Sequence, residues 1–178
     1  MDPIKIIFFV LGTFAGNEES RIIAEHAAVT VNPIARTIEI RQEGLFAILF
    51  TQEDHASLSQ ELQLLKNDTL WCDELADYPV KSRVFQVHDD GALSVNLKLK
   101  YNTDEDLKAY GITLTDDGNL AFTNFPDDNV NTVDGKLEGN YWLFKADQPF
   151  SFTQTPHQVL PEQFKPFKKE LSGSDIKK

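Results

Sequence analysis

Ten residues near the middle of the chain, ALSVNLKLKY at 92–101, alternate between apolar and polar side chains. Successive side chains of a β-strand point to opposite faces of its sheet, so this alternation predicts a strand with one buried and one hydrated face. Shorter alternating stretches come earlier, at 29–31 and 38–41, and a continuous apolar run occupies 45–50. Strand therefore follows strand with few helical crossovers between them, which favours antiparallel pairing.

Three Asp-Gly pairs punctuate this pattern, and Asp-Gly is a strong signal for a tight hairpin turn. They occur at 90–91, 117–118 and 134–135, each between or beside short apolar runs. A further break at Glu43-Gly44 separates the strand at 38–41 from the run at 45–50, which we interpret as a third strand. Residues 150–153 predict an additional edge strand.

Two segments change to helical spacing. The first, TQEDHASLSQELQLL, begins with Thr51 and Asp54 in the positions of a capping box. The second, NTDEDLKAYG, carries the same cap at Thr103 and Asp106 and ends at Gly111, which suits a left-handed C-cap. The two caps lie 52 residues apart, and each follows a pair of strands, so a duplicated β-β-α unit is one interpretation and independent caps are the other.

These elements predict an α+β fold, predominantly an antiparallel β-sheet of hairpins with two short helices packed on one face. A chain of 178 residues suits a single core, and we place the domain at 25–156. Beyond it the periodicity fades into a Lys-rich segment with prolines, so the sequence predicts a flexible C-terminal tail over 157–178.

The N-terminal segment KIIFFVLGTFAGNEES has two competing interpretations. Residues 6–14 have the length and character of the apolar core of an export signal, and Thr13 and Ala15 are small residues suited to a cut after Ala15. A buried first strand is the other possibility. We predict a signal peptide at 1–15, a periplasmic or secreted protein, and no membrane span in the mature chain.

The same region also carries a run of motifs in order: IIFFVLG, then TFAGNEES, then RIIAEHAA. This succession of apolar strand, small and hydroxylic loop, and possible helix resembles the segment that opens a flavodoxin. The resemblance covers residues 4–28. It implies a flavin-binding oxidoreductase that holds the flavin phosphate at 12–18, within a doubly wound parallel sheet.

Charge and cysteine content exclude several classes of partner. The formal net charge is -11 and the pI is about 4.7, so the averaged field repels nucleic acids. The single cysteine, Cys72, cannot form an internal disulfide or a thiolate metal cage. For a non-catalytic domain with a binding or structural role we expect no cofactor.

One motif has the spacing of a calcium loop. In DDNVNTVDGKLE, oxygen-bearing side chains occupy positions one, three, five and twelve, although Thr132 stands where the sharp turn needs glycine. A plain polar loop that ends in an Asp-Gly hairpin explains the same residues. The candidate metal ligands are Asp127, Asn129, Asn131 and Glu138.

Catalytic signals are sparse. His88-Asp89-Asp90 offers a base beside carboxylates, but it falls on a predicted hairpin turn, where Asp is common. The sequence lacks a serine nucleophile elbow and a Lys-bearing phosphate loop. We therefore predict that the protein is not an enzyme. The expected role is binding or structural, as an exported domain whose partner is an unknown protein or small molecule.

Overall fold

The computed structural model describes residues 22–67, 71, 73–124, 129–155 and 160–176. Ten strands, two α-helices and three 3₁₀ helices lie within these residues. In chain order they are β1 (Ile22–Asn32), β2 (Thr37–Ile48), α2 (Gln52–Leu65), η2 (Asp73–Leu75), β3 (Val80–Val87), β4 (Leu93–Lys100), η3 (Asp104–Tyr110), β5 (Ile112–Leu114), β6 (Asn119–Thr123), β7 (Lys136–Glu138), β8 (Tyr141–Lys145), β9 (Phe150–Gln154), η5 (Lys165–Phe167), β10 (Lys168–Glu170) and α3 (Gly173–Ile176).

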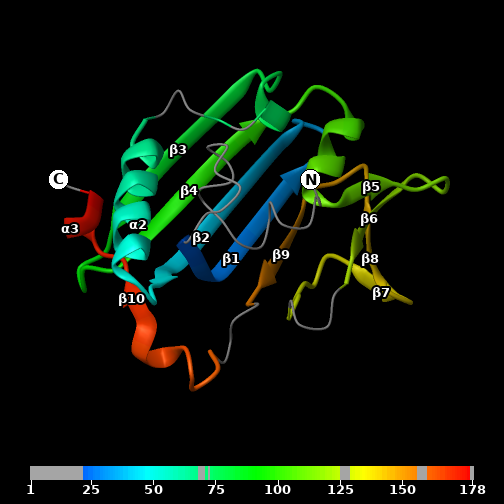
Figure 1. The fold of residues 1–178 in the computed structure, drawn as a ribbon. Coiled ribbons are helices and arrows are strands. Elements are labelled where there is room, and N and C mark those ends of the chain that lie inside the picture. The colour runs from blue at the N-terminus through cyan, green and yellow to red at the C-terminus, as the bar shows by residue number, and fades with distance from the viewer. Residues whose placement is uncertain (1–21, 68–70, 72, 125–128, 156–159, 177–178) are drawn as a thin grey trace.

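The largest unit is a six-stranded sheet in the order β3-β4-β2-β1-β9, with β10 pairing β2 beyond the start of β4 (Figure 1). Every strand pair among the described residues is antiparallel. The predicted α+β fold of antiparallel hairpins with short helices is therefore confirmed. The architecture differs from the parallel sheet that the flavodoxin resemblance implies.

A second sheet, in the order β5-β6-β8-β7, stands beyond β9 at the side of the molecule away from α2 (Figure 1). Stacked phenylalanines join the two sheets. Phe144 lies on Phe150 with ring centroids 4.1 Å apart, and Phe122 lies on Phe152 at 4.9 Å. One continuous hydrophobic core thus runs from α2 through the main sheet to the small sheet.

The buried side of the β1–β2 ribbon changes at Gly44. Along β2 the buried positions are even-numbered up to Gln42 and then include the odd-numbered Leu45 and Ala47. Gly44 adopts a φ of +62°, which glycine tolerates because it has no Cβ. The predicted break at Glu43-Gly44 was therefore wrong as a strand end: the strand continues, and its register against β1 is the same on both sides of Gly44.

Both predicted helices form where their caps were expected. Asp54 N–H donates to Thr51 Oγ1 at 3.2 Å, and the Asp54 carboxylate accepts from Thr51 N–H at 2.8 Å. Thr103 and Asp106 form a related cap ahead of η3: the Thr103 N–H and Oγ1 donate to the Asp106 carboxylate at 3.1 and 3.2 Å. The helix ends at Gly111 with a φ of +69°. The second element is a 3₁₀ helix of seven residues, whereas α2 has fourteen, and the duplication hypothesis stays untested.

Two of the three Asp-Gly pairs form the predicted hairpin turns, between β3 and β4 and between β5 and β6. The third, Asp134-Gly135, was wrongly predicted, because it precedes β7 and the turn to β8 lies at Gly139-Asn140. Gly139 there has a φ of +59°. Residues 150–153 fall in β9, an edge strand of the main sheet as expected.

Residues 160–176 belong to the fold, which the prediction of a flexible tail over 157–178 did not anticipate. β10 pairs with β2, and Leu171 is 2% exposed with its N–H donating to the Leu45 carbonyl at 2.8 Å. α3 follows, and Gly173 N–H donates to the Gly91 carbonyl. The main sheet thus includes β10, although the sequence pattern had placed these residues outside the domain.

Candidate functional site

Among the described residues no helix or strand covers the face of the six-stranded sheet that points away from the core, and we call it the outer face. A hollow of about 550 Å³ lies on it, spanning four strands. Because successive side chains of a strand point to opposite faces, the side chains on the outer face come from the strand residues that alternate with the buried core residues. The side chains that line it are mostly polar and come from Ala28, Thr30, Glu39, Arg41, Ser82, Val84, Gln86, Asn96 and Lys98, together with the backbone of Ile40 and Leu97.

Charges on the outer face are arranged in opposite pairs. Lys98 Nζ lies 2.6 Å from Glu39 Oε1, and Arg41 lies 2.5 Å from Glu43 Oε1. These side chains are about half exposed, so the pairs add little stability, but they leave the face close to neutral. Hydroxyl and amide groups then remain for hydrogen bonding. The described residues that line the hollow include no aromatic ring that could stack on a ligand.

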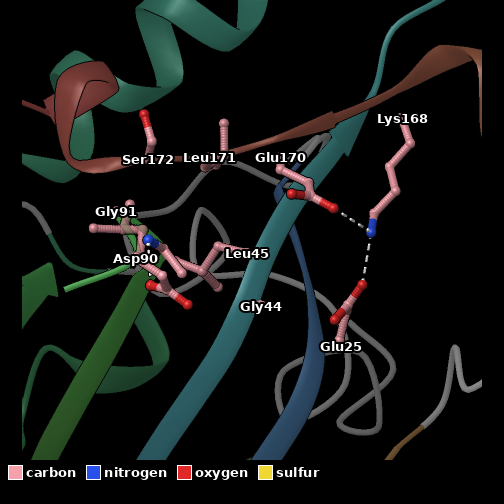
Figure 2. Close-up of a pocket in the computed structure, with 11 residues that line it drawn as sticks. Glu25, Gly44, Leu45, Asp90, Gly91, Lys168, Glu170, Leu171 and Ser172 are labelled. Atoms are coloured by element: carbon pink, nitrogen blue, oxygen red, sulfur yellow. Dashed lines mark hydrogen bonds and ion pairs between the residues drawn. The ribbon is translucent and has the colours of Figure 1, made fainter. Parts of the chain in front are cut away.

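A second, smaller cavity of about 310 Å³ opens where β4 begins and β10 takes over its place beside β2 (Figure 2). Lys168 Nζ donates to Glu25 Oε1 at 2.7 Å and to Glu170 Oε1 at 3.2 Å. Its ammonium also lies 5.0 Å from the centre of the Phe46 ring. The hydrogen bond to Glu25 raises the pKa of Lys168, burial acts in the opposite direction, and Glu170 adds to the rise.

Asp90 lies across this cavity from Lys168, and its Oδ1 accepts from Ala92 N–H at 2.9 Å (Figure 2). The charged groups therefore already have partners within the protein. Lys168 binds β10 to β1 across β2, and Asp90 holds the hairpin turn. These contacts at the edge of the cavity stabilise the fold, and both charged groups are already hydrogen-bonded within the protein.

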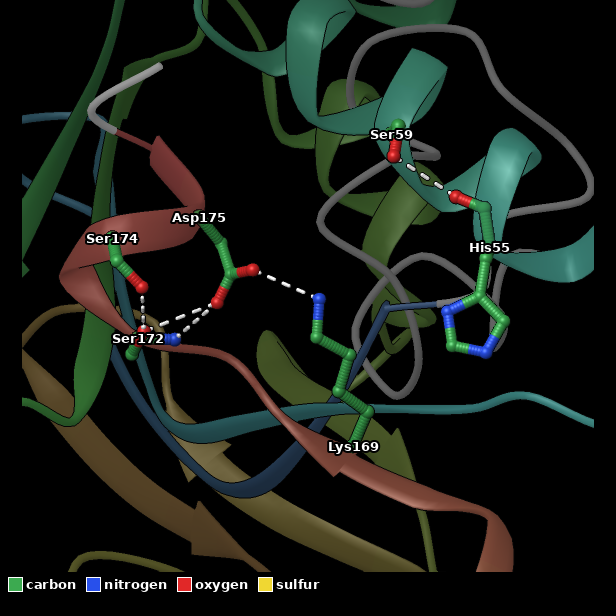
Figure 3. Close-up of polar contacts among 6 residues, drawn as sticks. All are labelled: His55, Ser59, Lys169, Ser172, Ser174 and Asp175. Carbon is green, nitrogen blue, oxygen red and sulfur yellow. Dashed lines mark hydrogen bonds and ion pairs between the residues drawn. The ribbon is translucent and has the colours of Figure 1, made fainter.

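A cluster of Ser172, Asp175 and Lys169 has the residue types of a hydrolytic site (Figure 3). Asp175 Oδ2 accepts from Ser172 N–H at 2.9 Å and from Ser172 Oγ at 3.1 Å, while Oδ1 accepts from Lys169 Nζ at 2.8 Å. Burial acts to raise the pKa of Asp175, but these hydrogen bonds lower it overall. The geometry is that of a helix cap on α3.

The histidine nearest this cluster does not complete a catalytic set. His55 lies on α2, and the hydrogen bond drawn for it joins its backbone carbonyl to Ser59 Oγ at 2.9 Å (Figure 3). General base catalysis needs the ring nitrogen within hydrogen-bond reach of the serine hydroxyl. Ser172 Oγ instead contacts Asp175 and Ser174.

The candidate calcium ligands are held by other contacts. Asn129 Nδ2 donates to the Thr155 carbonyl at 3.1 Å, and Asn131 pairs through its backbone with Thr153. The Glu138 carboxylate lies 2.8 Å from Lys136 Nζ. Asp127 lies outside the described residues. In the described part of the chain no three His, Cys, Asp or Glu side chains are grouped so that they could hold a metal ion, and the calcium site stays a prediction.

His88 has a partner that the sequence analysis did not identify. Its Nε2 lies 2.9 Å from Oγ of Ser94, a residue with no exposed surface, while the Asp90 carboxylate bonds Ala92. Residues 12–18, the predicted flavin loop, lie outside the described residues.

Two buried glutamines were also missed. Gln42 and Gln154 are 1% and 0% exposed, and both flank Ala27 in the register of β2, β1 and β9. Neither amide has a hydrogen-bond partner among the described residues. Gln42 follows Ile38 and Ile40 in the alternation, so its inward direction was present in the sequence as a signal.

Comparison with protein-family models, curated proteins and solved structures found no match to the chain. Within the residues that the structure describes, no helix is both long and apolar enough to cross a membrane.

Proposed function

We propose that the protein is a non-catalytic, exported domain that binds another molecule on the outer face of its six-stranded sheet. The observation that carries the binding role is the hollow of about 550 Å³, which spans β1, β2, β4 and β3. Its paired charges and its hydroxyl and amide side chains favour a neutral, polar ligand with several hydrogen-bonding groups.

Asn96 provides the best test, because it lines the hollow from a central strand and is partly exposed. We would add two defined probe sets, short uncharged peptides and neutral oligosaccharides, and follow backbone amide shifts by NMR. Binding should shift the signals of Thr30, Gln86 and Asn96, and Asn96→Leu should abolish the shifts. Thr113→Val, on the exposed side of β5, is the matched control.

Failure of both probe sets to shift these signals, or shifts that persist in Asn96→Leu, would contradict binding at the hollow. The non-catalytic part has its own test. Turnover of any substrate that disappears in His88→Ala would contradict it, since His88 is the imidazole that the sequence analysis placed beside carboxylates.

The export part rests on the sequence of residues 1–15, and its test is the N-terminal residue of the mature protein from its native host. Gly16 as the first residue supports a cut after Ala15. Met1 or Asp2 as the first residue would overturn export by this signal.

A further inference from the structure

β3 forms one edge of the main sheet. It pairs with β4 on one side, and in the described part of the chain no strand pairs with its other side (Figure 1). An edge strand presents a row of backbone donors and acceptors that another strand can use.

The turn into β4 sets the direction of the backbone groups. His88 N–H donates to the Ala92 carbonyl at 2.9 Å, so the backbone groups of His88 point toward the β4 side of the hairpin. In an antiparallel ladder such residues alternate with residues whose N–H and C=O point the other way. The odd-numbered residues, Lys81, Phe85 and Val87 among them, therefore direct their backbone groups to the outer edge.

The side chains of β3 leave this edge without the usual protection. Exposed edges are commonly blunted by charged side chains or proline. Lys81 is turned away, because its Nζ donates to the carbonyls of Leu75 and Ala76 at 2.8 and 2.9 Å. Arg83 is 5% exposed and bonds the Asn67 carbonyl. No charged side chain is exposed on β3: its exposed residues include Val80, Val84 and Val87, at 46%, 54% and 47%, and the uncharged Ser82 and Gln86.

We propose that β3 pairs with β3 of a second copy of this chain, antiparallel, about a two-fold axis at Val84. In this register Lys81 faces Val87 of the second copy, and Arg83 faces its Phe85. Lys81, Arg83, Phe85 and Val87 are odd-numbered, so their backbone groups point to the outer edge and form hydrogen-bonded pairs between the two copies. Val84 then meets its own copy in a non-hydrogen-bonded pair, where side chains approach most closely.

Neighbouring registers of two paired β3 strands are less favourable. This difference favours pairing of two copies of the chain about an axis at Val84. If the axis moves to Arg83, this residue lies opposite its own copy, which is a like-charge contact. The same register places Pro79 in a hydrogen-bonded pair, where it has no N–H to donate. A shift in the other direction runs the pairing into the turn after Val87. The register centred on Val84 avoids both problems, which is the self-complementarity that a two-fold interface requires.

One strand pair buries little surface, so the dimer should be weak and reversible. The net charge of -11 on each copy opposes association at low ionic strength, and added salt should screen this repulsion and strengthen the dimer. Val84 also lines the proposed ligand hollow, but the dimer is argued from the backbone edge of β3 and does not require a ligand in that hollow.

The test is sedimentation equilibrium of the full chain from micromolar to millimolar concentration. Wild type should show a monomer–dimer equilibrium that strengthens with salt. Val84→Lys and Val84→Glu should each raise the dissociation constant at least about tenfold, because like charges would meet on the axis. An equimolar mixture of the two variants should restore dimers. Val84→Thr, which keeps the branched shape, and Val133→Lys, at a distant residue that is 96% exposed, are controls.

A wild-type mass that stays monomeric to millimolar concentration would overturn the proposal. So would dimers that persist in both charged variants, or a mixture that fails to associate while circular dichroism shows both variants folded. As a second measurement, Val84→Cys in a Cys72→Ser background should form a disulfide-linked dimer on oxidation. The same change at Val80, which does not face its own copy, should not.

Discussion

Lys168 Nζ lies 2.7 Å from Glu25 Oε1, although the two residues are 143 positions apart in the chain. The ion pair crosses β2 and joins β10 to β1, the first described strand. Lys168 is 22% exposed and packs over the Phe46 ring, so its charge is partly desolvated. This contact therefore holds β10 against the first strand that the structure describes.

Removal of the Lys168 charge should loosen β10. Lys168→Met keeps most of the alkyl chain over Phe46 and removes the ammonium, and we expect a loss of about 1 kcal/mol in unfolding free energy by urea denaturation. Lys136→Met is the control, because its pair with Glu138 is well exposed and should contribute nothing measurable. Equal stability of Lys168→Met and wild type would show that β10 is held by its backbone alone.

The same pair predicts a dependence on pH. The pKa of Lys168 is raised, mainly by its hydrogen bond to Glu25, so the folded state holds this proton more tightly than the unfolded state. The stabilisation is complete below the pKa of an unfolded lysine, about 10.4, and disappears as pH rises through the higher folded value. The stability difference between wild type and Lys168→Met should therefore shrink in that range.

Gly44 should tolerate no side chain. A Cβ built there would lie 2.6 Å from Glu25 Oε2 and 3.0 Å from Glu25 Cβ, and the φ of +62° is unfavourable for other residues. We expect Gly44→Ala to cost about 3 kcal/mol, measured by chemical denaturation. Gly91→Ala separates the two causes, because its φ is +84° but no atom of the described residues lies within 4 Å of the added Cβ. It should cost only about 1 kcal/mol.

A further substitution checks the steric cause. In Glu25→Ala the carboxylate that meets the new Cβ is gone, so Gly44→Ala should cost less in that background than in wild type. Equal costs in both backgrounds would assign the whole effect to the backbone conformation.

Local signals predicted the elements that depend on short stretches of chain. The caps at Thr51 and Thr103 formed, because each is completed by a residue three positions on. The turn at Asp90-Gly91 formed because both of its flanking strands are long and pair with each other. At Asp134-Gly135 the preceding residues instead lie along β9, where Thr132 Oγ1 donates to the Ser151 carbonyl and Asp134 accepts from Ser151 N–H.

Features that depend on distant residues could not be predicted in this way. β10 has only three residues, too few to show a period, and its partner on β2 lies more than a hundred positions earlier. Glu43-Gly44 has the composition of a turn, yet its neighbours stay paired with β1 on both sides of Gly44. The outer-face hollow likewise needs the strand order β3-β4-β2-β1, which no single stretch of sequence contains.

The buried glutamine of β2 should be replaceable by an apolar residue. The Gln42 amide is buried without a partner among the described residues, and an unsatisfied polar group of this kind costs about 1–3 kcal/mol. Gln42→Met has a similar shape, so we expect a rise of about 1–2 kcal/mol in unfolding free energy. Gln86→Met, on the exposed outer face, should change stability by less than about 0.5 kcal/mol.

Calorimetry of both glutamine variants provides the measurement. A lower melting temperature for Gln42→Met would contradict the expectation and would indicate that the amide binds an internal water, as buried polar groups often do. Gln154→Met tests the same idea on the other side of Ala27, because Gln154 has no exposed surface and an equally unpartnered amide.

Tyr101 should set part of the stability at high pH. Its ring is 1% exposed and its hydroxyl has no hydrogen-bond partner among the described residues. Burial raises the pKa of Tyr101 to about 12, with a further contribution from Asp104, while Arg36 acts in the opposite direction. The unfolded chain ionises this group near pH 10, so the folded state alone keeps it protonated between about 10 and 12.

Stability must therefore fall as pH rises through that window, because the unfolded state gains from ionisation and the folded state does not. Tyr101→Phe removes this loss, which amounts to about 2–3 kcal/mol at the upper end, and at pH 7 it should be neutral or stabilising. Urea denaturation at pH 7 and pH 11 tests both points, with Tyr141→Phe, half exposed on β8, as the control. A wild-type protein that loses no more stability than Tyr101→Phe between these two pH values would show that the hydroxyl ionises as readily in the folded chain as in the unfolded one.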